Sequence, residues 1–263
     1  MKDNIPVVIL CGGKGMRLFE ETEYKPKPLV EVGGKPILWH IMKNYSSFGY
    51  RDFVLCLGYR GGMIKDYFAH FDILNSDVTI TVGAAGAPEV REVPSCEKWR
   101  VTLADTGQEA MTGARVKRVE RYIDTDVFML TYGDGVADVD VRELLEFHRE
   151  HGKLGTITGV APLSRFGELC VEGNRVVSFC EKPHAADTWI NGGFFVFSRG
   201  FLDYLTDEDS CILETAPLEN LAQDGQLMVY KHQGFWHCMD TMRDVNSLSA
   251  LWRGGKAPWR TWP

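Results

Sequence analysis

Short apolar runs alternate with amphipathic segments of helical length along most of the chain. Four runs have the length and composition of buried strands, at 7–10, 53–57, 78–82 and 127–131. Four segments carry apolar residues at helical spacing, at 36–48, 62–71, 112–123 and 139–151. Strands that alternate with helices are typical of βαβ units. The pattern therefore predicts an α/β fold, with a mostly parallel central sheet and flanking helices.

The pattern of apolar and polar residues changes after residue 154. Short strands separated by turns follow as far as residue 197, which predicts a smaller mixed β region, and helical periods return at 212–222 and 243–252. The stretch 83–97 is rich in glycine, alanine and proline, and we expect it to leave the core as an excursion. No repeat or linker interrupts the sequence, so we expect one domain over 1–263.

The composition is that of a globular protein, and the net charge limits which partners it can have. The chain has 263 residues, of which 44% are hydrophobic and 25% are charged, as in ordinary globular proteins. The formal net charge of -7 gives no footprint for nucleic acid or for an anionic membrane. We therefore expect neither as a partner, and any phosphate group must bind at a local site.

The cysteines and the N-terminus indicate a cytoplasmic protein. Seven cysteines are scattered without CxxC or Cys/His spacing, which argues against a disulfide framework or a zinc site. The apolar run near the N-terminus is too short for a signal peptide, and no later run has the length of a membrane span.

The first candidate site follows the first predicted strand, in the stretch VVILCGGKGMRL. Gly12, Gly13 and Gly15 let the backbone approach a ligand, and their N–H groups can surround phosphate oxygens. A tight turn without a ligand explains three glycines about equally well. The stretch matches neither GxGxxG nor GxxxxGK[ST], so a dinucleotide oxidoreductase and a P-loop kinase are poorly supported.

Basic residues close to this loop favour a phosphate ligand. Arg17 offers a fork of donors, and Lys25 and Lys27 each precede a proline that holds them outside a helix. A solvated basic surface is the alternative. Because the chain is acidic overall, an isolated basic cluster behind a glycine turn favours phosphate binding.

Two aspartates are candidate metal ligands. Asp134 follows a buried strand in the stretch FMLTYGDGVADVD, at the sheet edge where ligands of open α/β folds bind. Asp240 follows an aromatic, strand-like run in GFWHCMDT, and it serves equally well as the cap of the next helix, as does Thr241. Mg²⁺ uses one or two carboxylates together with phosphate oxygens. Asp138 and Asp140 are more simply explained as the start of a helix.

These motifs resemble those of the sugar-1-phosphate nucleotidyltransferases. LCGGKGMRL is similar to the Leu-Ala-Gly-Gly loop of that family, which ends in Thr-Arg-Leu, with Cys11 and Met16 as departures. Further stretches resemble the glucose-1-phosphate cytidylyltransferase branch, among them EETEYKPKPLVEVGGKPILWH, TLADTGQEAMTGARVKRV, TYGDGVAD and INGGFFVF. The similarity covers nearly the whole chain and is looser at 83–97 and 163–187.

The resemblance implies a set of site residues. Arg17, Lys27, Asp134 and Asp240 would be the catalytic group, and the two aspartates would hold Mg²⁺. The nucleotide would contact Leu10, Cys11, Gly12, Gly13, Lys14, Gly15, Met16, Arg17, Lys27, Thr112, Gly113, Arg115 and Gly133. Thr112 would cap the 112–123 helix, whose N-terminus suits an anion. The sugar and its phosphate would contact Glu181, Lys182, Asn191 and Gly192. For Glu181 and Lys182, a charged turn between strands is the simpler explanation.

The resemblance also implies the reaction. A sugar 1-phosphate oxygen would attack the α-phosphorus of CTP in line and release pyrophosphate, with no protein nucleophile. The implied partners are CTP and a sugar 1-phosphate, in nucleotide-sugar biosynthesis, and the family's assemblies imply a homo-oligomer. The nucleotide part would span about 1–152, and the sugar-binding and C-terminal part about 153–263. A nucleotide-sugar-binding relative without catalysis, or a different sugar or base, remains an alternative.

Overall fold

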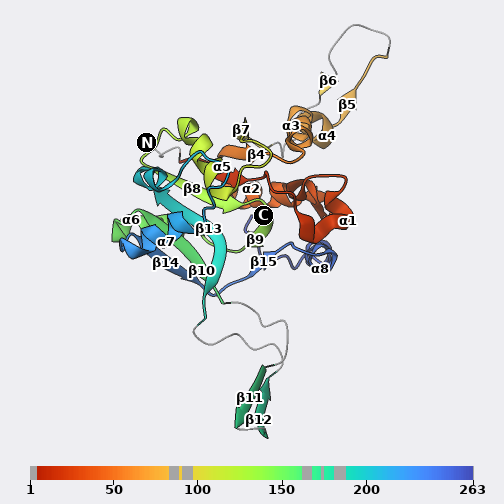
Figure 1. Ribbon diagram of the computed structural model, residues 1–263. Helices are drawn as coiled ribbons and strands as arrows, with labels where there is room; N and C mark the ends of the chain where they lie inside the picture. Colours follow the sequence, from red (N-terminus) through yellow and green to blue (C-terminus); the bar gives the residue numbers. More distant parts are fainter. Residues whose placement is uncertain are drawn as a thin grey trace.

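The computed structural model describes residues 5–82, 89–90, 97–161, 168–172, 175–180 and 188–262. Within these ranges, a seven-stranded sheet forms the centre of the molecule, in the order β14-β10-β13-β8-β1-β4-β7 (Figure 1). Its strands are β1 (Val7–Leu10), β4 (Asp52–Leu57), β7 (Arg100–Asp105), β8 (Val127–Tyr132), β10 (Gly155–Val160), β13 (Ile190–Ser198) and β14 (Leu227–His232).

Most neighbouring strands of this sheet are parallel. β1 pairs in parallel with β4 and with β8, β4 with β7, and β10 with β14. β13 runs antiparallel to β8 and to β10, so the sheet is mixed. The predicted α/β fold with a mostly parallel sheet is confirmed.

Helices and short ribbons surround the sheet. The helices are α1 (Phe19–Thr22), α2 (Ile37–Ser47), α3 (Gly61–Ala69), α4 (Phe71–Asn75), α5 (Thr112–Arg118), α6 (Val141–His151), α7 (Ala216–Gln223) and α8 (Met242–Arg253). Two-stranded antiparallel ribbons join β2 (Glu31–Val32) to β3 (Lys35–Pro36), β5 (Val78–Thr79) to β6 (Glu89–Val90), β9 (Gly135–Ala137) to β15 (Trp236–Cys238), and β11 (Glu168–Glu172) to β12 (Arg175–Cys180).

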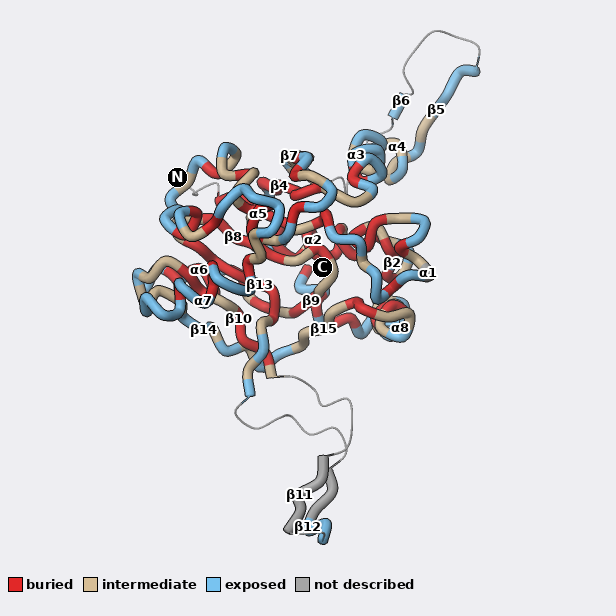
Figure 2. Tube along the Cα trace, viewed as in Figure 1, coloured by how far each residue is buried: buried red, intermediate tan, exposed pale blue. Residues whose placement is uncertain are grey.

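The core lies on both faces of the sheet. Val7 and Ile9 of β1 pack in one apolar cluster with α2, α6 and α8, whereas Val8 packs in another with α5 and α7. This alternation follows from the two-residue period of a strand. Figure 2 shows the buried residues concentrated along these strands and on α2.

Some predicted boundaries are wrong, each for a local reason. The predicted strand 78–82 ends at Thr79, and Ile80 and Val82 are exposed, so no buried face extends it. The predicted helix 112–123 ends at Arg118 and continues as a short 3-10 turn over Glu120–Tyr122. The predicted helix 212–222 begins only at Ala216, next to Pro217, which suits a first turn.

Asp138 and Asp140 were both expected at the start of a helix, and the structure supports this for Asp140 alone. Asp140 is the N-cap of α6 and accepts hydrogen bonds from the N–H groups of Arg142 and Glu143, as expected for a helix start. Asp138 instead lies 2.9 Å from Nε2 of His232. Within the stretch 83–97, Glu89–Val90 forms β6, which pairs with β5 before the stretch, and this ribbon projects from the α3–α4 end in Figure 1. Most of the stretch lies outside the described residues.

Among the residues described, no helix combines the length and apolar character needed to cross a membrane.

Candidate active site

The glycine loop leaves the carboxyl end of β1, between β4 and β8. The carbonyl of Gly12 accepts a hydrogen bond from the N–H of Tyr59, and the carbonyl of Leu10 accepts one from the N–H of Gly133. A Cβ at position 133 would lie 2.7 Å from the Leu10 carbonyl oxygen, so only glycine fits there. This close approach places Asp134 directly beside the loop.

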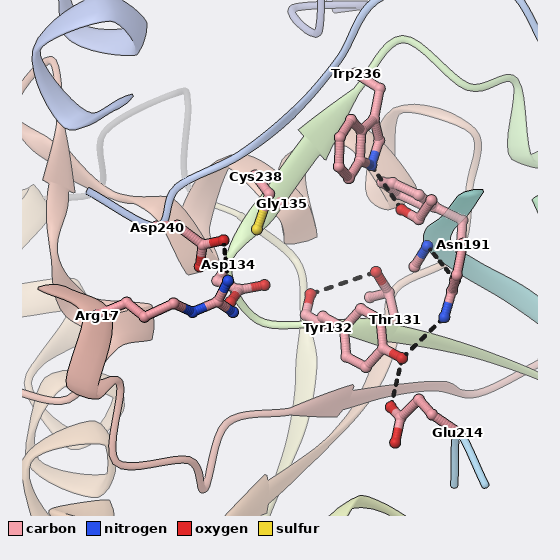
Figure 3. A pocket seen from close by; sticks show the side chains of 13 residues that line it. Arg17, Thr131, Tyr132, Asp134, Gly135, Asn191, Glu214, Trp236, Cys238 and Asp240 are labelled. Carbon is pink, nitrogen blue, oxygen red and sulfur yellow. Dashed lines mark hydrogen bonds and ion pairs between the residues drawn. The ribbon is translucent and has the colours of Figure 1, made fainter. Parts of the chain in front are cut away.

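A lysine joins the two aspartates predicted as metal ligands. The Nζ atom of Lys27 lies 2.7 Å from Oδ2 of Asp134 and 2.7 Å from Oδ1 of Asp240. Nη1 of Arg17 lies 2.7 Å from Oδ2 of Asp240 (Figure 3). The structure therefore brings together the four residues Arg17, Lys27, Asp134 and Asp240, which are up to 223 positions apart in sequence.

The charge of Lys27 is stabilised by its partners. Burial alone would lower its pKa, but the charge of Asp134 and hydrogen bonds to both aspartates outweigh burial, so the pKa of Lys27 is raised. Pro26, in an extended conformation, and Pro28 flank the lysine and fix the short turn that carries it inward. The ammonium therefore remains protonated in the site.

Asp240 was expected to be either a metal ligand or the cap of the next helix, and the structure gives the cap position to Thr241. Thr241 is the N-cap of α8, and its hydroxyl and the carboxylate of Asp244 form a reciprocal capping box. The side chain of Asp240 instead contacts Arg17 and Lys27, and only its backbone N–H donates to Asp244. Asp240 thus points into the charged cluster while its neighbour caps the helix.

The carboxylates suit a divalent cation. One ligand atom from each of Asp134, Cys238 and Asp240 lies within 4.8 Å of the other two. Mg²⁺ prefers oxygen ligands, usually one or two carboxylates with phosphate oxygens and water, so the two aspartates fit this ion and the thiol does not.

A cavity of about 350 Å³ opens beside this cluster. It is lined by Arg17, Thr131, Tyr132, Asp134, Gly135, Asn191, Gly192, Gly193, Phe194, Glu214, Trp236, Cys238 and Asp240 (Figure 3). The Tyr132 hydroxyl donates to Glu214 and accepts from Asn191, and the indole N–H of Trp236 donates to the Gly192 carbonyl at 2.7 Å. A cavity with Arg17 and two carboxylates at one end and hydroxyl, amide and carboxylate groups at the other suits a small phosphorylated polyol.

Asn191 and Gly192, which the resemblance implied as sugar contacts, both line this cavity, but other lining residues were not predicted. Tyr132 lies one position before the noticed Gly133, and Trp236 lies in the aromatic run before Asp240. Glu214 lies within the predicted helix 212–222, but the observed helix begins only at Ala216, after it. Tyr132 and Trp236 could have been found because each lies close to a recognised motif, and the sequence carries no comparable signal for Glu214.

The N-terminus of α5 differs from expectation. Thr112 was predicted as the helix cap, but the cap position is Met111, and the Thr112 hydroxyl donates to Glu214 and accepts from the N–H of Leu213. The N–H groups of Gly113 and Ala114 both donate to the Cys211 carbonyl. This helix end is therefore occupied by the chain itself, and the expectation that it suits an anion is wrong.

Arg115 lies behind the glycine loop. It is 4% exposed, and its guanidinium donates to the carbonyls of Gly12, Leu57, Gly107 and Gln108 and to the Thr106 hydroxyl. A Cβ at Gly12 would lie 2.2 Å from its Nη1 atom. Arg115 thus fixes the loop from inside, whereas Gly13, Lys14 and Met16 lie on the exposed side.

Two predicted sugar-site residues, Glu181 and Lys182, lie outside the described residues. Cys11, Cys56, Cys211 and Cys238 are free thiols.

Comparison with known proteins identifies the family. The nucleotidyl transferase family model matches residues 6–257. The glucose-1-phosphate cytidylyltransferases of Salmonella typhi and Salmonella typhimurium are each 52% identical to this chain, over 97% of this chain and 98% of the relative. A structure of UDP-glucose pyrophosphorylase complexed with UDP-glucose matches with a TM-score of 0.67 at 14% identity, covering 95% of this chain and 99% of that one, and shows the shared fold. The chain therefore belongs to the nucleotidyl transferase family.

Proposed function

We propose that this chain transfers the cytidylyl group of CTP to α-D-glucose 1-phosphate, forming CDP-glucose and pyrophosphate. The observation that carries the proposal is 52% identity to glucose-1-phosphate cytidylyltransferases over nearly both full lengths. The paired cations and carboxylates beside a cavity of sugar size agree with it.

The loop and the cavity suggest where each substrate binds. CTP would lie along Leu10–Arg17, with the exposed Gly13 and Lys14 near the phosphates and the Arg115 side of the loop away from them. The sugar would occupy the cavity. Tyr132, Asn191 and Glu214 offer hydroxyl, amide and carboxylate groups to sugar hydroxyls, and Trp236 supplies an apolar ring.

The residues support an in-line displacement. An oxygen of the sugar phosphate forms a bond to the α-phosphorus of CTP, the bond from that phosphorus to the bridging oxygen of the β-phosphate breaks, and pyrophosphate leaves with the electron pair. Arg17 and Lys27 attract the two polyanions to one place and balance charge that develops on phosphate oxygens. Asp134 and Asp240 would hold Mg²⁺, which would neutralise and align those same oxygens.

The remaining assignments belong to the same proposal. Glu181 and Lys182 would contact the sugar and its phosphate, and Thr112, Gly113 and Gly133 would shape the nucleotide side of the site. The nucleotide part of about 1–152 and the sugar part of about 153–263 would act together, because the cavity takes residues from both. We also propose that the enzyme works in the cytoplasm as a homo-oligomer.

A matrix of four nucleoside triphosphates against several sugar 1-phosphates tests the function, with pyrophosphate release as the measurement. We expect the fastest release with CTP and glucose 1-phosphate in the presence of Mg²⁺. Because the reaction exchanges one phosphoanhydride for another, CDP-glucose and pyrophosphate should also regenerate CTP. Release with a different pair only would change the substrate assignment, and no release with any pair would favour a binding protein.

A further inference from the structure

Cys238 lies beside the two carboxylates of the site, and the proposed reaction gives it no role. It ends β15, and its register partner in β9 is Gly135, the residue after Asp134. The N–H of Met239 donates to the Asp134 carbonyl at 2.8 Å. This pairing fixes Cys238 and Asp240 opposite Asp134, and Figure 3 shows the sulfur directed toward the carboxylates.

The three side chains form a donor set of a particular kind. Two carboxylate oxygens and one sulfur lie within 4.8 Å of one another. In a tetrahedral zinc site, bonds of about 2.0–2.3 Å separate the ligands by roughly 3.3–3.8 Å, so the side chains need to close by only about 1 Å. Mg²⁺ has little use for the sulfur, whereas Zn²⁺ and Co²⁺ bind thiolates well.

The carboxylates already converge on a positive charge. The Lys27 ammonium lies 2.7 Å from an oxygen of each aspartate. Burial and the charges of Asp134 and Asp240 raise the pKa of the Cys238 thiol, so the thiol carries a proton that a metal ion would have to replace. With the sulfur bound as a thiolate, the anionic donors would be three, facing the two cations Lys27 and Arg17. A metal ion that uses the sulfur therefore has one ligand more than a metal ion that binds the aspartates alone.

We propose that Asp134, Cys238 and Asp240 form a site for a thiophilic divalent cation such as Zn²⁺, which competes with Mg²⁺ for the two carboxylates. As the metal binds, the thiol releases its proton to solvent and the sulfur forms a bond to the metal. Lys27 gives up its contacts to the bound oxygens. This inference rests on the metal role proposed above for the two aspartates.

Cysteine spacing could not reveal such a site, because its partners come from different elements of the chain. Cys211 provides a matched control. It is a free, half-buried thiol like Cys238, but it packs against Gly113 at the start of α5 and takes no part in the acidic group.

The experiment titrates Co²⁺ alone into the metal-free full-length protein and records the near-ultraviolet spectrum. We expect a sulfur-to-cobalt charge-transfer band in the wild type and in Cys211→Ser, and no band in Cys238→Ser. Zn²⁺ should displace Co²⁺ with an affinity at least about tenfold higher in the wild type than in Cys238→Ser. The affinity for Mg²⁺ should be alike in all three proteins.

A wild type without the band overturns the proposal, as does a band that persists in Cys238→Ser or disappears in Cys211→Ser. Should circular dichroism show that Cys238→Ser does not fold, Cys238→Ala replaces it. Calorimetric titration of Mg²⁺ into the wild type and Asp134→Asn separates this inference from the proposed function. If Mg²⁺ binds the wild type more tightly than Asp134→Asn but no cobalt band exists, only the role of Cys238 fails. If Mg²⁺ binds the two proteins alike, the metal role of the aspartates fails as well.

Discussion

Two buried cations lie against different glycines of the loop, Arg115 beside Gly12 and Lys27 beside Gly15, and their surroundings differ. Lys27 is 7% exposed and contacts two carboxylates, whereas Arg115 is 4% exposed and contacts carbonyl and hydroxyl oxygens. The charges around Lys27 overcome burial and raise its pKa. Burial dominates at Arg115 and lowers its pKa, with only partial compensation from nearby groups.

The difference separates a chemical role from an architectural one. The ion pairs of Lys27 and Arg17 face the cavity side of the loop, where a phosphate group can take the place of a carboxylate. The donors of Arg115 satisfy carbonyls of the chain itself, including that of Gly12 in the loop. Under the proposed function, Lys27 would offer charge to a ligand, and Arg115 would hold the loop in the shape that the ligand needs.

The largest effect should come from removing the anions beside Lys27. Asp134→Asn and Asp240→Asn should each lower turnover at least about a hundredfold, because each would remove a proposed metal ligand, while the fold persists. Steady-state kinetics and thermal melting measure the two properties. Asp140→Asn is the matched control, since that carboxylate caps α6 and should affect the melting temperature alone. Near wild-type turnover of Asp240→Asn would remove it from the metal site.

Substitution of Arg115 should mainly lower stability, whereas substitution of Lys27 should mainly lower turnover. Arg115→Met leaves several buried carbonyls without donors, so the free energy of unfolding should fall by about 2 kcal/mol in urea titrations. Lys27→Met should remain folded in the presence of Mg²⁺ and lose turnover at least about tenfold. The comparison fails if both variants lose mainly stability, or if Arg115→Met unfolds at the wild-type urea concentration.

Substitution of Arg17 tests whether the exposed side of the glycine loop recognises phosphate specifically. Its side chain is 75% exposed and forms one ion pair, so Arg17→Ala should fold normally while CTP affinity falls by at least about tenfold in calorimetry. Arg121→Ala removes an exposed positive charge after α5 and serves as the control. Equal losses in the two variants would mean that the general field of the protein, rather than Arg17, attracts the nucleotide.

The sequence predicted the features that depend on local pattern. The β1 and β8 runs are almost wholly buried, and the helical series Ile37, Leu38, Ile41, Met42 and Tyr45 packs in the core as its spacing predicted. Asp134 and Asp240 could be proposed as partners because each follows an apolar strand. These inferences required only neighbours in sequence.

Features that depend on distant partners were not predictable. The helix end at Thr112 looked free in sequence, yet Cys211 and Leu213 occupy it from about a hundred residues away. The resemblance implied that Arg115 contacts the nucleotide, but its hydrogen-bond partners are chain oxygens from three separate segments. Hydrogen bonds of this kind form only after the sheet has assembled, so no local pattern encodes them.

His148 is a buried group with no acidic partner among the described residues, so it tests whether burial alone shifts a pKa. Its substitution should give the smallest effect of the series. His148 lies between the hydroxyls of Thr156 and Ser198, and burial, followed by the nearby His151 and Arg149, lowers its pKa from 6.5 to about 4. The unfolded chain therefore takes up this proton near pH 6.5, and the folded chain does so only near pH 4. Stability must fall as the pH drops through that window, since the unfolded state binds more protons there. We expect His148→Gln to remove on the order of 1 kcal/mol of the difference in unfolding free energy between pH 7 and pH 5, measured by urea titration at both values. An unchanged profile in His148→Gln would show that the buried imidazole is not a source of the pH dependence, and that burial without an opposite charge does not suppress ionisation at this site.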